Sequence, residues 1–251
     1  IGVNNTDPDD VFNASPNWWG SIRGPAAGQI VGLATYDPWC GDAACSFLVY
    51  GTSQANGFYF DSQGRLVIAG EVHIAGGITI NEPGLTILLK NGAVIHNDSP
   101  CFTVNANNVT ITAETFGGAK CVPTGGADGI VVNDGKNGVR ILGLEIDGSD
   151  SAGTADGIHF AGATTDFQIV NNFIHNMGGN AVEFVGTPGG TTMDIQGNLF
   201  KDNTGAAIAV PAGANLDATY NSWGAMAAPI ISDVITDPNT HVKVFVESSG
   251  T

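Results

Sequence analysis

The chain has 251 residues, of which only 8 are Lys or Arg, and its formal net charge is −16. This excess of acidic groups argues against nucleic acid and anionic membranes as partners. It also disfavours a polyanionic polysaccharide unless calcium bridges the charges. The sequence contains no run of 18 apolar residues, so we expect no membrane span in this chain.

The first 64 residues lack any repeat, and we expect a non-repeating N-terminal segment that ends in entry strands. Asp7, Asp9 and Asp10 lie close together in it and offer hard oxygen ligands that suit calcium. The alternative is a solvated acidic turn. Near the end of the segment, Asn56-Gly57 indicates the turn of a hairpin.

Residues 65–224 consist of short apolar strands separated by glycine and asparagine, and one pattern recurs three times near their end. Aligned on Asn172, Asn198 and Asn221, the copies follow at steps of 26 residues (198 − 172) and 23 residues (221 − 198). Such a step, without a segment long enough for a crossover helix, predicts an all-β solenoid, a parallel β-helix. We expect the asparagines to stack at successive corners about 4.8 Å apart and to bond neighbouring coils.

Two segments within the coils are rich in glycine and small polar residues, and we expect both to project as loops. They cover residues 114–128 and 147–156. After residue 224 the pattern ends, and residues 225–251 are expected to form a closing segment and a short C-terminal strand.

The four cysteines suggest two disulfides, with four buried free thiols as the alternative. Cys101 and Cys121 are 20 residues apart (121 − 101), close to one coil, so neighbouring coils would bring them together. Cys40 and Cys45 would close a small loop. Two disulfides would imply an oxidising compartment, and we expect an extracellular or cell-surface protein.

A longer-range repetition links the two ends of the chain. The segment FNASPNWWGSIRGP, residues 12–25, matches LDATYNSWGAMAAP, residues 216–229, without gaps. Asn17 aligns with Asn221 and Trp19 with Trp223, both at an offset of 204 residues (221 − 17). The motif that finishes the last coil therefore also stands at the start, where no coil precedes it.

The two segments resemble the closing segment of right-handed parallel β-helix domains of the pectate-lyase-like superfamily. They are especially similar to surface repeat proteins of bacteria and archaea, in which an Asn-x-Trp-Gly segment follows the last coil. The resemblance implies a β-helix over roughly residues 65–240 but selects no activity, because the superfamily includes lyases, hydrolases, adhesins and structural proteins. The second copy departs from the pattern at Ser222 and Ala228.

The tryptophans of the motif suggest either plugs for the open ends of the solenoid or platforms for sugar stacking. The C-terminal HVKVFVE alternates like an exposed strand that could add to another sheet. The residues that we expect to serve assembly are Trp18, Trp19, Trp223, Val242, Val244 and Val246.

Two columns of outward side chains are candidate acid/base sites. Placing the coils in register puts Asp147, His175 and Lys201 in one column, and His159 beside Glu183 in another. The second pair could share a proton or a metal. The alternative for both columns is a set of solvated side chains whose inward neighbours fill the core.

Aspartates around the loop at 147–156 form a second candidate calcium site, carried by Asp147 and Asp150. Here too the alternative is a solvated acidic turn. Asp128 and Asp156 each precede a Gly-Ile strand, and Asn180 takes the same place one coil later. We expect these three side chains to cap turns.

Taken together, these features favour an extracellular structural or adhesive surface protein that assembles head-to-tail into a fibre or tandem array. Its expected partners are copies of itself and possible surface glycans, with calcium as the one possible cofactor. The rival hypothesis is a polysaccharide lyase or glycoside hydrolase that acts on the outer face of the β-helix.

Overall fold

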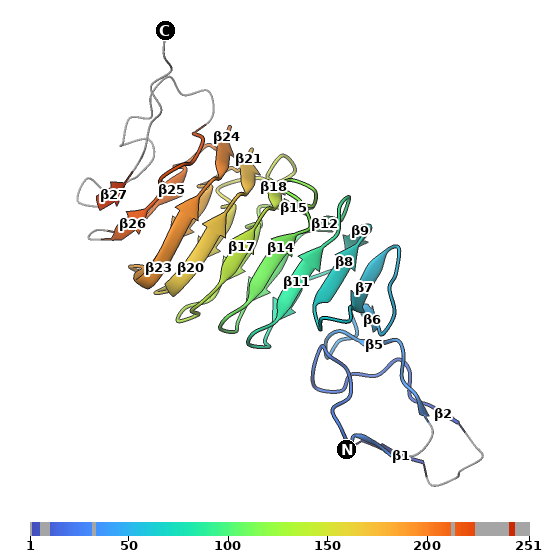
Figure 1. Ribbon diagram of the computed structural model, residues 1–251. Coiled ribbons are helices and arrows are strands. Elements are labelled where there is room, and N and C mark those ends of the chain that lie inside the picture. The colour runs from blue at the N-terminus through green and yellow to red at the C-terminus, as the bar shows by residue number, and fades with distance from the viewer. Residues whose placement is uncertain (1, 6–10, 32–33, 212–213, 224–240, 244–251) are drawn as a thin grey trace.

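The computed structural model describes residues 2–5, 11–31, 34–211, 214–223 and 241–243. They form an all-β parallel solenoid of about 8 turns without a helix, which confirms the predicted fold class (Figure 1). Three sheets run along the solenoid, and we name them the β8, β9 and β10 sheets after their first strand in the coils. In the described part of the chain, no helix is long and apolar enough to cross a membrane.

The β10 sheet stacks one short strand from each of six coils, all parallel and in register. Most of its strands place one outward side chain between two buried apolar ones, as alternation along a strand requires. The strands are β10 (Ile78–Ile80), β13 (Phe102–Val104), β16 (Ile130–Val132), β19 (Ile158–Phe160), β22 (Val182–Phe184) and β25 (Ile208–Ala209).

The β9 sheet also has six parallel strands, but here the middle residue points inward and its neighbours tend to point outward. Ile174 and Phe200 are two of these buried residues, so the predicted inward neighbours of the first column are confirmed. The strands are β9 (Glu71–His73), β12 (Val94–Asn97), β15 (Lys120–Pro123), β18 (Glu145–Asp147), β21 (Phe173–His175) and β24 (Leu199–Lys201).

The β8 sheet is the longest, with eleven strands, and it continues beyond the coils at both ends. From β8 to β27 its strands are parallel, whereas β7 pairs antiparallel with β8. The strands are β5 (Trp39–Cys40), β6 (Leu48–Tyr50), β7 (Gly57–Phe60), β8 (Leu66–Ala69), β11 (Thr86–Leu89), β14 (Thr110–Ala113), β17 (Arg140–Leu142), β20 (Thr165–Val170), β23 (Gly189–Gln196), β26 (Asn215–Asp217) and β27 (His241–Lys243).

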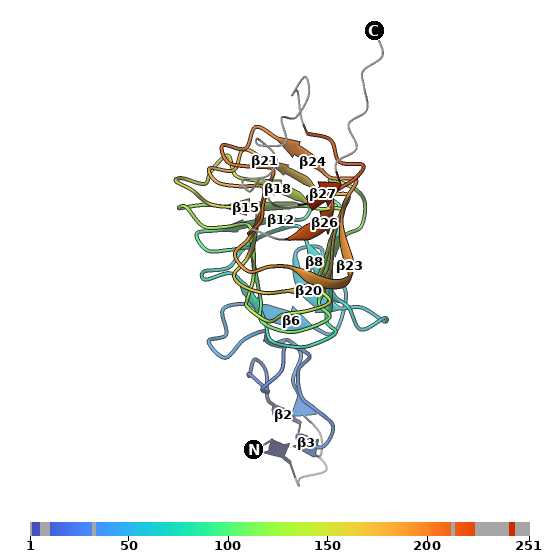
Figure 2. The same ribbon diagram turned by 90° about the vertical axis from the view of Figure 1, so that its left-hand side faces the viewer.

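The three sheets enclose one apolar core along the stack, as Figure 2 shows by looking roughly along the coils. Like residues stack on like residues from coil to coil. Phe160 and Phe184, on neighbouring strands of the β10 sheet, lie with their ring centroids 4.5 Å apart and nearly parallel. Such stacking adds to the hydrophobic burial that holds consecutive coils together.

The predicted asparagine ladder is present at one corner of the coils. Asn172, Asn198 and Asn221 are buried, and hydrogen bonds join each of them to the next. Asn198 Oδ1 accepts from the backbone N–H of Asn172 at 2.9 Å, and Asn221 Oδ1 accepts from that of Asn198 at 2.8 Å. The ladder satisfies backbone groups that the turn would otherwise leave buried without a partner.

Both predicted disulfides are present. Cys40 bonds to Cys45 in the N-terminal segment. Cys101, at the corner before β13, bonds to Cys121 on β15, so this disulfide joins neighbouring coils inside the core. The segment 114–128 was expected to project as a loop, and this is wrong for its middle, where Lys120–Pro123 form β15.

The hairpin expected at Asn56-Gly57 is displaced. Strand β6 pairs parallel with β7 through Val49 and Phe58, so the connection between them is not a hairpin turn. The antiparallel hairpin is formed one strand later, by β7 and β8 around the turn at Asp61. Asp61 Oδ1 accepts from two backbone N–H groups of that turn, which explains why it forms there.

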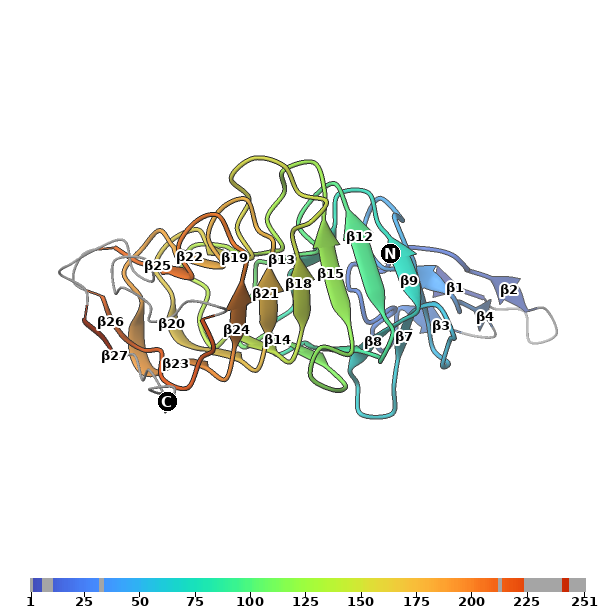
Figure 3. The ribbon, with the colours of Figure 1, turned by 90° about the horizontal axis from the view of Figure 1, so that it is seen from above.

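The N-terminal segment forms parallel pairs although its sequence carries no repeat. Its strands pair β1 (Val3–Asn4) with β3 (Ile30–Val31) and β2 (Phe12–Asn13) with β4 (Ala34–Thr35). Figure 3 shows this segment at one end of the solenoid and strands β26 and β27 at the other. The two copies of the Trp-Gly motif therefore lie at opposite ends of the stack.

Candidate functional site

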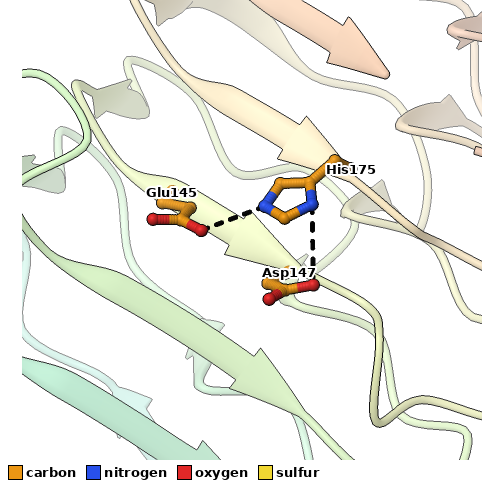
Figure 4. A group of neighbouring side chains, drawn as sticks. All are labelled: Glu145, Asp147 and His175. Carbon is orange, nitrogen blue, oxygen red and sulfur yellow. Dashed lines mark hydrogen bonds and ion pairs between the residues drawn. The ribbon is translucent and has the colours of Figure 1, made fainter. Parts of the chain in front are cut away.

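The first candidate site is a cluster of charged side chains on the outer face of the β9 sheet. Glu145 and Asp147 alternate along β18, and His175 lies beside Asp147 on β21, as the register predicted (Figure 4). His175 Nε2 is 3.0 Å from Glu145 Oε1, and its Nδ1 is 3.6 Å from Asp147 Oδ1. A fourth member, Lys120 on β15, places Nζ 2.7 Å from Glu145 and 3.2 Å from Asp147.

Neighbouring side chains fix the imidazole of His175. Asn176 Nδ2 lies 2.8 Å from His175 Nδ1 and 3.1 Å from Asp147 Oδ1. A carboxylate only accepts, so this Asn176 atom is the amide nitrogen and also donates to Nδ1. The imidazole proton therefore sits on Nε2, where it is donated to Glu145. Phe173 stacks on the ring at 4.0 Å between centroids, which holds its plane.

Hydrogen bonds and ion pairs among the side chains of this cluster stabilise its charged groups. Burial opposes the ionisation of Asp147, but hydrogen bonds from Asn176, Ser149 and Lys120 outweigh it and lower its pKa to about 2. The hydrogen bond to Glu145 raises the pKa of Lys120. The ionised forms of Asp147 and Lys120 are thus both stabilised by partners within the cluster, as in a structural ion network.

This arrangement differs from the predicted column in two ways. The side chains of Asp147 and His175 are largely buried, so the expectation that they are solvated is wrong. Lys201 lies beside His175 in register, but its side chain is 53% exposed and its ion pair is with Asp202 at 3.5 Å. Lys120 and Glu145, which the sequence analysis missed, take the place that Lys201 was expected to fill.

The second candidate site, on the β10 sheet, contains His159 and Glu183 in the predicted register. His159 Nδ1 lies 2.8 Å from Glu183 Oε2 and 3.3 Å from Oδ2 of Asp156, which precedes β19. The three ligand atoms all lie within 4.8 Å of one another. One imidazole nitrogen therefore stands between two carboxylates.

A second ladder of polar side chains holds Asp156 at this site. Asp128 Oδ1 accepts from the backbone N–H of Asp156 at 2.8 Å, and Asp156 Oδ1 accepts from that of Asn180 at 2.5 Å. Asn180 in turn accepts from the N–H of Ala206 at 2.9 Å. The predicted capping role of Asp128, Asp156 and Asn180 is confirmed, and it leaves Asp156 Oδ2 facing His159.

This second cluster opens into a surface hollow of about 490 Å³. Among the described residues that line the hollow, none is Lys or Arg. Burial, together with the neighbouring carboxylate of Asp156, raises the pKa of Glu183, and burial raises that of Asp128. The hollow therefore concentrates carboxylates without the compensating ammonium group that the first cluster has.

The predicted calcium ligands fall in different places. Both carboxylate oxygens of Asp147 are engaged, Oδ1 by Asn176 and Ser149 and Oδ2 by Lys120, and Asp150 is exposed. Asp7, Asp9 and Asp10 lie outside the described residues, so a calcium site there stays a prediction.

The tryptophans of the motif lie at both ends of the core. Trp19 and Trp223 are buried, and Trp223 packs on Phe200 with 5.3 Å between centroids, which supports their predicted role as plugs. Neither indole N–H has an acceptor among the described residues. Trp18 is instead exposed, beside a cavity of about 660 Å³ that also contacts β10. Of the C-terminal valines, Val242 lies in β27, which pairs with β26, whereas Val244 and Val246 lie outside the described residues.

The two motif copies share their local hydrogen bonds. Asn17 Nδ2 donates to the carbonyl of Ala14 at 2.6 Å, and Asn221 Nδ2 donates to the carbonyl of Ala218, the equivalent residue, at 2.8 Å. The backbone N–H of Ser15 bonds the side chain of Asn13, and the N–H of Thr219 likewise bonds Asp217. Over residues 13–17 and 217–221, the sequence match is therefore accompanied by matching local hydrogen bonds.

The fold and its ends define a disulfide-linked parallel β-solenoid with a related turn motif at each end. No protein-family model, no curated protein and no solved structure matches the chain. Its function is therefore argued from its own geometry.

Proposed function

We propose that this chain is an extracellular structural or adhesive module that assembles end to end with copies of itself. The resemblance of the chain's two end motifs to the closing segment of bacterial and archaeal surface β-helix proteins is part of this proposal. Two disulfides support an oxidising, extracellular compartment. The observation that carries the proposal is the difference between the surroundings of the two motif copies.

The C-terminal copy of the motif is covered by the coil before it. Leu216 is 1% exposed, and its strand β26 pairs with β23 of the preceding coil. Asn221 Oδ1 accepts from Asn198 of that coil, and Asn221 Nδ2 donates to the carbonyl of Ile195 at 2.6 Å. The side chain of Leu216, the edge of β26 and the amide of Asn221 thus all contact the preceding coil.

The equivalent groups of the N-terminal copy are uncovered. Phe12, which aligns with Leu216, is 51% exposed, and Val11 beside it is exposed as well. Among the described strands, β2 pairs only with β4, and its other edge has no partner. Asn17 is exposed, and its Oδ1 accepts no hydrogen bond from the described residues. Among the described residues, no coil covers the N-terminal copy as one covers its counterpart.

A second copy of the chain is the occupant that fits this surface best. A parallel solenoid is polar, so the edge that lacks a preceding strand at one end complements the edge that lacks a following strand at the other. At the C-terminal end, β25 is such an edge, because among the described strands it pairs only with β22. Contacts of this kind do not close on themselves and so propagate into a fibre.

The test is the association of the purified, oxidised chain as its concentration rises, followed by analytical ultracentrifugation and electron microscopy. We expect linear oligomers of the wild-type chain, and Phe12→Asp should abolish them by placing a charge in an apolar contact. Phe116→Asp is the matched control, because Phe116 is 59% exposed on a lateral loop. Monomers of the wild-type chain at high concentration, or equal association of Phe12→Asp and wild type, would refute the proposal.

The rival lyase or hydrolase has weaker support. Within its expected acid/base column, Lys201 is paired with Asp202, and the cluster around His175 is internally compensated. In the second cluster the ligand oxygens of Asp156 and Glu183 lie within 4.8 Å. The short spacing favours a shared proton or cation instead.

A further inference from the structure

The group formed by Asp156, His159 and Glu183 has the chemistry of a metal site. It offers two carboxylate oxygens and one imidazole nitrogen that already lie within 4.8 Å of one another. They come from rigid elements: His159 and Glu183 from paired strands, and Asp156 from the turn that leads into β19. Ligands fixed in this way lose little freedom when they bind an ion.

The supporting turn is built closely around the carboxylate of Asp156. Its Oδ1 accepts from the backbone N–H of Asn180, which orients Oδ2 toward His159. Gly179 lies so near that a Cβ at this position would come within 2.5 Å of Asp156 Oδ1. The same Cβ would lie 2.4 Å from the carbonyl oxygen of Thr154, so a larger residue would disturb the turn that holds Asp156.

The first cluster provides an internal comparison for the charge. There, Lys120 lies between Glu145 and Asp147 and supplies the positive charge for two carboxylates. In the second cluster the outward neighbours of His159 and Glu183 along the sheet are Val131 and Ala209, which carry no charge. A cation from solution can therefore fill the place that Lys120 fills in the first cluster.

We propose that Asp156, His159 and Glu183 bind a divalent first-row metal ion of the zinc type. The imidazole nitrogen disfavours Ca²⁺ and Mg²⁺, which prefer oxygen ligands alone. Zn²⁺ accepts mixed nitrogen and carboxylate ligands, and three protein ligands leave one position open. That position faces the hollow of about 490 Å³, where water or an outside donor can complete the coordination. The proposal does not depend on end-to-end assembly.

Titration of the oxidised full-length chain with Zn²⁺ alone, by isothermal calorimetry, tests the proposal. We expect one site that His159→Gln and Glu183→Gln each weaken by about 100-fold or more, because loss of a second-shell partner already costs 10- to 100-fold. Ca²⁺ in excess should not displace the zinc.

His96→Gln is the matched control, because His96 pairs with a single carboxylate, Glu71, at 3.5 Å on the outer face of the β9 sheet. It should leave zinc binding unchanged. Circular dichroism of each variant verifies that the fold is intact. Absence of zinc binding to the wild-type chain, or equal binding by His159→Gln and wild type, would overturn the assignment.

Discussion

Replacing the buried Asn198 by alanine should destabilise the stack of coils more than replacing an exposed asparagine does. The side chain accepts from the backbone N–H and the Nδ2 of Asn172, and it donates to the carbonyl of Ile169 at 2.8 Å. Alanine leaves the N–H of Asn172 and the carbonyl of Ile169 without this partner, whereas Asn172 Nδ2 keeps its bond to the carbonyl of Ile141. At about 1–3 kcal/mol for each of the two unsatisfied buried groups, we expect a loss of about 2–6 kcal/mol.

Asn105→Ala is the control for this change, because Asn105 is exposed and donates one side-chain hydrogen bond to Asn81. Its loss should cost less than about 1 kcal/mol. Urea unfolding followed by circular dichroism measures the free energies, and native-state hydrogen exchange of the Asn172 amide reports the local effect. If Asn198→Ala loses no more stability than Asn105→Ala, the ladder does not hold the coils together as argued.

Three further changes test the two clusters and the core. The pKa of Asp147 is about 2 in the folded chain against an ordinary 3.8, so its ionisation stabilises the fold above pH 4 and this contribution disappears as the pH falls toward 2. Asp147→Asn should therefore cost about 2 kcal/mol at pH 7 and little near pH 2 in a pH series of thermal unfolding, and a constant difference would contradict this. The pKa of Glu183 is raised, so its ionisation costs stability as the pH rises, and Glu183→Gln should make the metal-free chain at least as stable as wild type at pH 7. A clear drop in its melting temperature at that pH would show that the carboxylate is stabilised by its surroundings. Replacing Cys101 and Cys121 together by alanine removes a cross-link across 20 residues and should lower the free energy of unfolding by about 3 kcal/mol in urea, whereas an unchanged midpoint would mean that the core alone holds these coils.

The features that could be predicted from the sequence are those that repeat. A parallel solenoid places residues one coil apart side by side, so the spacing of Asn172, Asn198 and Asn221 was sufficient to predict their ladder. The same register placed His159 beside Glu183 and Asp147 beside His175, which the strand pairs confirm. In each case the side chains belong to strands in which alternating apolar residues determine which side chains face the core and which face outward.

The features that were missed depend on what lies between the strands. Lys120 stands in a segment with several glycines that was expected to be a loop, and only the pairing of β15 with β18 places it beside Glu145. Asp156 was predicted as a turn cap, and its second oxygen was not connected with His159 because a turn, unlike a strand, sets no alternation. Loop lengths differ from coil to coil, so a fixed step could not locate either residue.

The antiparallel pairing of β7 with β8 separates the N-terminal segment from the parallel coils. A reversed strand on the first edge of the β8 sheet ends the parallel stack there, because a further coil in the same sense could not pair with β8. Beyond this junction, β2 and β4 form a separate parallel pair. Since this pair carries a turn motif related to the one at the far end, the coils lie between two related ends. A contact between such ends would continue the stack from one molecule to the next while leaving the hollow beside His159 on the lateral face uncovered.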